Sequence, residues 1–164
     1  MACGLGWLLA AGCWEPNGPM QVDPAPPQVD LGARVGLVQS ASFETATSTS
    51  NAPPDVDVTV ADSATAQDIA NAILDLPAMP PGNYTNCPID YGISYYLAFT
   101  GVGGQTVMAA WLYPDGCQWA QVTDGGPFIN NQLWSLGSPG FWSHLAADLG
   151  VPEAEIFPYQ PPSP

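Results

Sequence analysis

Two kinds of hydrophobic repeat run through the second half of the chain. Valines alternate strictly with polar residues over 55–60, and every second residue is apolar or aromatic over 91–100. A period of two indicates a half-buried strand. Two more apolar segments, 106–113 and 118–123, follow a glycine-rich turn and a Pro-Asp-Gly turn. The three segments from residue 91 onward therefore predict an antiparallel meander.

A helical period of three to four residues occurs in two other places. The first predicted helix covers about 64–76, with Asp62 or Ser63 as its N-cap. The second covers about 139–149, with Ser138 as its N-cap and a proline in the first helical position. Strands and helices of these lengths predict a small α+β fold built on an antiparallel sheet.

The first residues of the chain have the pattern of an export signal. A short apolar run is followed by Ala-Ala-Gly and then Cys13. Small residues directly before a cysteine resemble the lipobox of bacterial lipoprotein signal peptides, which implies cleavage after residue 12 and lipidation of Cys13. Two alternatives stay open: a signal peptide without lipidation, or a start codon assigned too far downstream.

The region between the signal and the strands is rich in proline and then in serine and threonine. Such composition favours an extended or flexible spacer. We therefore predict a signal peptide at 1–12, a tether at 13–54 with a possible strand at 34–43, a folded domain at 55–158 and a tail at 159–164. Anchor, spacer and domain, in this order, are expected for a protein held at the cell surface.

The charge balance excludes several classes of partner. The chain of 164 residues carries fifteen acidic residues and a single basic one, Arg34, for a formal net charge of −14. Nucleic acids are bound through lysine and arginine, so a nucleic-acid partner is excluded. Anionic lipid surfaces are disfavoured for the same reason. We expect membrane contact only through a lipid anchor, and an unknown protein or glycan partner is left open.

The cysteines predict a disulfide. Cys87 directly precedes the first strand of the meander, and Cys117 opens the third, so both should lie at the same end of the sheet. Cys3 and Cys13 fall in the signal region. We predict a Cys87–Cys117 bridge in an oxidising compartment, and the alternative is a pair of reduced, buried thiols. Two cysteines and one histidine are too few ligands for a zinc site, and we expect no metal or other cofactor.

The candidate catalytic groups are few. Asp90 and Asp115 should lie near the disulfide, where two carboxylates can act as acid and base or hold a metal, although turns also favour aspartate for structural reasons. His144 is the only histidine and precedes Asp148 by one helical turn. Ser143 is its neighbour, and adjacent helical positions point in different directions, which disfavours a catalytic triad. We expect an exposed His–Asp pair and no enzymatic activity.

Aromatic residues provide the remaining candidate surface. Tyr96 faces away from the alternating apolar set of its strand, and we group it with Asp90 and Asp115 as a candidate surface site. It could join a platform for a sugar or a protein with Tyr95, Trp111, Trp119 and Trp134. Aromatic residues on strands also serve as core, and both interpretations stay open.

The segment 87–99 (CPIDYGISYYLAF), followed later by Gly-Cys, resembles a group of uncharacterised small secreted or lipid-anchored proteins of actinobacteria and their relatives. The likeness covers about 56–152 and implies no activity. The order helix, Cys-Pro, strands and second cysteine is also similar to the subtilisin inhibitors of streptomycetes, which implies a reactive bond at Ile89–Asp90.

Together these observations predict an extracellular or envelope protein, lipid-anchored, that acts as a binding or structural domain. The alternatives are a secreted protease inhibitor and a weak hydrolase that uses Asp90 and Asp115.

Overall fold

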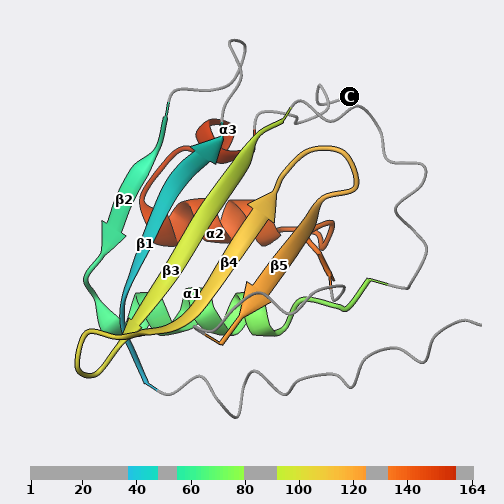
Figure 1. Cartoon of the computed structure of the whole chain (residues 1–164). Helices are drawn as coiled ribbons and strands as arrows, with labels where there is room; N and C mark the ends of the chain where they lie inside the picture. The colour runs from blue at the N-terminus through green and yellow to red at the C-terminus, as the bar shows by residue number, and fades with distance from the viewer. Residues whose placement is uncertain (1–36, 48–54, 80–91, 125–132, 158–164) are drawn as a thin grey trace, which may run out of the picture.

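The computed structural model describes residues 37–47, 55–79, 92–124 and 133–157 (Figure 1). These residues form a six-stranded antiparallel sheet in the order β2-β1-β3-β4-β5-β6. Three helices lie together on one side of it, behind the sheet in Figure 1. The elements are β1 Val38–Thr47, β2 Asp57–Val60, α1 Ser63–Leu74, β3 Ser94–Gly101, β4 Thr106–Tyr113, β5 Trp119–Thr123, β6 Trp134–Ser135, α2 Phe141–Leu149 and α3 Glu153–Ile156. The predicted α+β class and the β3-β4-β5 meander are confirmed.

The position of β1 corrects the predicted domain boundary. We assigned residues 13–54 to a tether, but β1 lies inside the sheet, paired with β2 on one side and β3 on the other. Its Ala41 and Phe43 side chains are 1% and 0% exposed. The possible strand predicted at 34–43 overlaps β1, but serine, threonine and glutamate on its opposite face give the region the composition of a spacer, so it was placed in the tether. The folded domain therefore includes 38–47.

The core lies between the helices and one face of the sheet. Cross-strand partners project to the same face, so the register Phe43–Leu97–Ala110–Val122 marks one row of core residues across four strands. Most of the rest of this face is also apolar and buried, and the helices cover it with Ala66, Ile69, Ala70, Ile73, Phe141, Trp142, Leu145, Ala146 and Leu149. The two layers share one continuous hydrophobic cluster.

Aromatic rings join the C-terminal helices to the sheet. The Tyr95 and Trp142 rings meet edge to face with centroids 6.4 Å apart, and Phe157 stacks on Trp142 at 5.4 Å. The Tyr95 hydroxyl donates to the carbonyl of Glu155 at 3.4 Å, which ties α3 to β3. The buried indole Nε1 of Trp142 has no hydrogen-bond partner among the described residues.

The helix ends follow the predicted signals in part. Asp62, one of the two alternative N-caps predicted for α1, is the N-cap of this helix. For α2 the prediction of Ser138 as N-cap is wrong, because the helix begins after Gly140, whose φ of 83° is left-handed and which offers no side-chain cap. Gly150 ends α2 with a φ of 70°. A glycine suits both sites since it adopts positive φ without strain.

The cap of α1 predicts a pH dependence of stability. Asp62 Oδ2 accepts hydrogen bonds from the backbone N–H and the hydroxyl of Thr65, both at 2.9 Å. These bonds, that from the backbone first, hold the pKa of Asp62 below its usual 3.8. Because the folded-state pKa is the lower one, the stabilisation is present above the unfolded-state value and is lost as pH falls through the folded-state value.

Replacing Asp62 with asparagine keeps a capping oxygen but removes this titration. We expect the free energy of unfolding to fall less steeply in D62N than in the wild type between about pH 5 and about pH 2. Urea denaturation at a series of pH values measures it, with Asp68→Asn, an exposed change on the same helix, as the control. Parallel curves for D62N and the wild type would contradict the prediction.

Candidate functional site

Asp115 holds the turn between β4 and β5 against the start of β3. It is 6% exposed, and its Oδ2 accepts the backbone N–H of Ile93 at 3.2 Å. Its carbonyl accepts the N–H of Gln118 at 3.0 Å, which closes the turn. The turn thus lies at the β3 start, as expected from the meander. Asp115 has a structural role here, while its predicted partner Asp90 lies outside the described residues.

The same turn contains Cys117, which is half-buried and disulfide-bonded. The other cysteines of the chain, Cys3, Cys13 and Cys87, lie outside the described residues. The pairing with Cys87 and the lipidation of Cys13 therefore stay predictions. The bond between Ile89 and Asp90, to which the resemblance to subtilisin inhibitors pointed, also lies outside the described residues.

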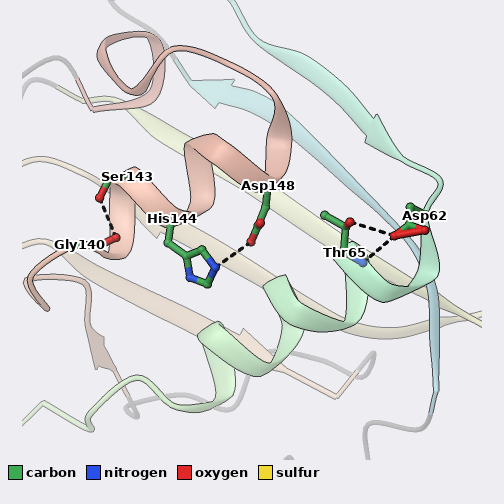
Figure 2. A network of polar contacts seen from close by, with 6 residues as sticks. All are labelled: Asp62, Thr65, Gly140, Ser143, His144 and Asp148. Carbon is green, nitrogen blue, oxygen red and sulfur yellow. Dashed lines mark hydrogen bonds and ion pairs between the residues drawn. The ribbon is translucent and has the colours of Figure 1, made fainter.

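The histidine cluster has the geometry of a surface ion pair. His144 Nε2 lies 3.5 Å from Asp148 Oδ2, one helical turn away, and the histidine side chain is 61% exposed (Figure 2). The Ser143 hydroxyl donates to the carbonyl of Gly140 at 3.0 Å instead of approaching the imidazole. These three side chains therefore form no triad. Within the described ranges, no group of three histidine, cysteine or acidic residues is arranged to hold a metal ion.

The predicted aromatic platform is divided between the two faces of the sheet. Tyr95 and Trp134 lie on the helix side and are 1% and 6% exposed, so they belong to the core and not to a platform. Tyr96, Trp111 and Trp119 lie on the outer face, which we define as the face turned away from the helices and toward the viewer in Figure 1. Of the five residues proposed for the platform, these three remain candidates.

Tyr113 completes what we call the aromatic patch: Tyr96, Trp111, Tyr113 and Trp119. The Tyr96 and Trp111 rings are cross-strand partners with centroids 5.3 Å apart, tilted by 54°. The Tyr113 and Trp119 rings stack at 3.8 Å. All four side chains are half-buried. We missed Tyr113 because we did not separate the faces of 106–113, although Met108, Ala110 and Leu112 already mark the core side by a period of two.

Two carboxylates extend the outer face beyond the aromatic rings. Glu44 on β1 lies directly opposite Asp57 on β2 and directly opposite Tyr96 on β3. Tyr96 pairs with Trp111, which pairs with Gln121 on β5. We call this line across five strands, Asp57–Glu44–Tyr96–Trp111–Gln121, the acid–aromatic row. The sequence did not predict it, because Glu44 was assigned to the tether.

None of the described helices is long and apolar enough to cross a membrane. Comparison of the chain with protein-family models finds no match, and neither does comparison with curated proteins or with solved structures.

Proposed function

We propose that this chain is an exported, envelope-tethered binding domain, and that the outer face of its sheet is the binding surface. The observation that carries the proposal is the aromatic patch, four rings gathered on the face that none of the three helices covers. Tyrosine and tryptophan combine large apolar area with a polar group, and they are enriched where proteins meet partners.

Two further features favour binding over catalysis. A nucleophile needs a base within hydrogen-bond reach, but the Ser143 hydroxyl donates to a main-chain carbonyl and His144 pairs with Asp148. The Asp115 carboxylate is buried and accepts a hydrogen bond from the main-chain N–H of Ile93, so it too is engaged in a structural contact. The export part of the proposal rests on the sequence around Cys13 and on a disulfide-bonded Cys117, since disulfides persist in oxidising compartments outside the cytosol.

The test compares retention of candidate ligands by the immobilised full chain and by two double variants. Tyr96→Thr with Trp119→Thr removes one ring from each pair of the aromatic patch and keeps β-forming side chains. Leu37→Ser with Val102→Ser is the control, because these exposed apolar residues (75% and 67%) lie outside the patch. The ligands are an array of soluble glycans together with basic, neutral and acidic peptides.

We expect at least one class of ligand to be retained by the wild type and by the control, and to bind the patch variant about tenfold more weakly, which corresponds to a loss of about 1.4 kcal/mol of stacking and contact area. Thermal unfolding of each variant shows that it is folded. Equal retention by all three proteins, or no retention by the wild type, would refute the outer face as a binding surface.

A further inference from the structure

The acid–aromatic row indicates which chemical class of ligand the outer face can bind. Antiparallel partners project side by side, about 5 Å apart between Cβ atoms, so Asp57 and Glu44 hold two carboxylates close together. Both residues are exposed. Like charges directly opposite each other on a sheet are destabilising. The described residues include no lysine or arginine, and the one histidine of the chain, His144, pairs with Asp148 on α2. The two carboxylates are thus left without a cation from this part of the chain.

The next two positions of the row attract cations by a different mechanism. The Tyr96 and Trp111 rings are tilted against each other by 54°, and both residues are partly exposed. Aromatic ring faces attract organic cations, tryptophan most strongly. Neighbouring strands lie about 4.8 Å apart, so a cation over Tyr96 is within reach of Glu44 on the next strand. One ligand group can therefore contact a ring and a carboxylate together.

We infer that the outer face binds an arginine-bearing, extended peptide segment, with a guanidinium group stacked on the Tyr96–Trp111 pair and hydrogen-bonded to Glu44, while Asp57, one strand further, adds charge attraction. This inference rests on the proposed function and names its ligand. Arginine fits best because its planar guanidinium both stacks on aromatic rings and offers paired donors to carboxylates. A hard metal ion would make no use of the rings, and a chain of net charge −14 repels an anionic ligand.

Isothermal titration of the full chain with an acetylated decapeptide of alternating glycine and arginine tests the inference. The double variant Glu44→Gln, Asp57→Asn removes both charges and keeps the side-chain shapes. Asp68→Asn with Asp75→Asn is the matched control, since it removes two exposed charges from the α1 region on the other side of the sheet. The comparison ligands are cellohexaose and a glycine–serine peptide, which is the same decapeptide with serine in place of each arginine.

We expect the wild type to bind the arginine peptide, the Glu44/Asp57 variant to bind it about tenfold more weakly, and the control to differ by less than about twofold. Binding should weaken as sodium chloride rises from about 50 mM to about 500 mM, because salt screens exposed charges. The Glu44/Asp57 variant should unfold at or above the wild-type temperature, since repulsion is removed. A lower unfolding temperature for this variant would overturn the premise that Glu44 and Asp57 lack a counter-charge.

Other outcomes overturn the inference without ambiguity. No binding of the arginine peptide by the wild type refutes it, and so does an equal loss in the two double variants, which would indicate a bulk charge effect. If cellohexaose or the glycine–serine peptide binds instead, and Tyr96→Thr with Trp119→Thr abolishes that binding, the arginine ligand is wrong while the proposed function stands. If no ligand depends on the outer face, both fail.

Discussion

Replacing Phe43 with alanine is expected to lower the free energy of unfolding by about 3–5 kcal/mol, the usual cost of removing a buried phenylalanine. Phe43 is 0% exposed, and its ring stacks on Tyr95 with centroids 4.9 Å apart. It also pairs with Val58 on one side and Leu97 on the other, so the cavity would open where three strands meet. Because single domains are stable by only about 5–15 kcal/mol, this one change should bring the protein close to unfolding.

Urea denaturation of the full chain measures the effect, followed by far-ultraviolet circular dichroism. Ser42→Ala is the matched control, because Ser42 is the preceding residue of the same strand and is exposed on the outer face. A surface change of this kind should alter stability by less than about 0.5 kcal/mol. If Phe43→Ala is as stable as the control, β1 is not part of the hydrophobic core, and residues 38–47 belong to the tether after all.

The disulfide at Cys117 should have the second largest effect on stability. If Cys117 pairs with Cys87, the bridge closes a loop of about 30 residues that contains β3 and β4. A loop of this size is worth roughly 3–4 kcal/mol in the chain-entropy model, because cross-linking restricts the unfolded chain. We therefore expect reduction, or the double variant Cys87→Ser with Cys117→Ser, to lower the free energy of unfolding by that amount.

Urea denaturation of the oxidised and reduced protein measures this loss, and Cys13→Ser is the control because it leaves the predicted bridge intact. Peptide mapping without reduction identifies the partner of Cys117 directly. Denaturation curves that superimpose before and after reduction would contradict the stabilising role. A cross-linked peptide that joins Cys117 to Cys3 or Cys13 would contradict the pairing, and with it the predicted loop.

The elements with strong local signals were predictable from the sequence. The apolar segment 106–113 between two turn signals matches β4 at both ends, and the helical period with its Asp62 cap predicts α1 to within two residues. These signals are local, because turn residues, a helical period and a capping side chain act on neighbouring residues. Asp115 could be located at the sheet end beside β3, since a tight turn links β4 to β5.

Only the tertiary structure decided the place of β1 and the neighbours of Tyr96 on the outer face. Polar residues fill one side of β1, so its sequence resembles a spacer until β2 and β3 pair with both of its edges. In β3 the period of two already separates Tyr96 from the face that holds Tyr95 and Leu97, but it does not say which residues lie beside Tyr96. The helices cover the Tyr95 side, so Tyr96 joins Trp111 and Glu44 on the other. Cross-strand register and helix placement are long-range choices, and they alone assemble the acid–aromatic row from segments that are far apart in the chain.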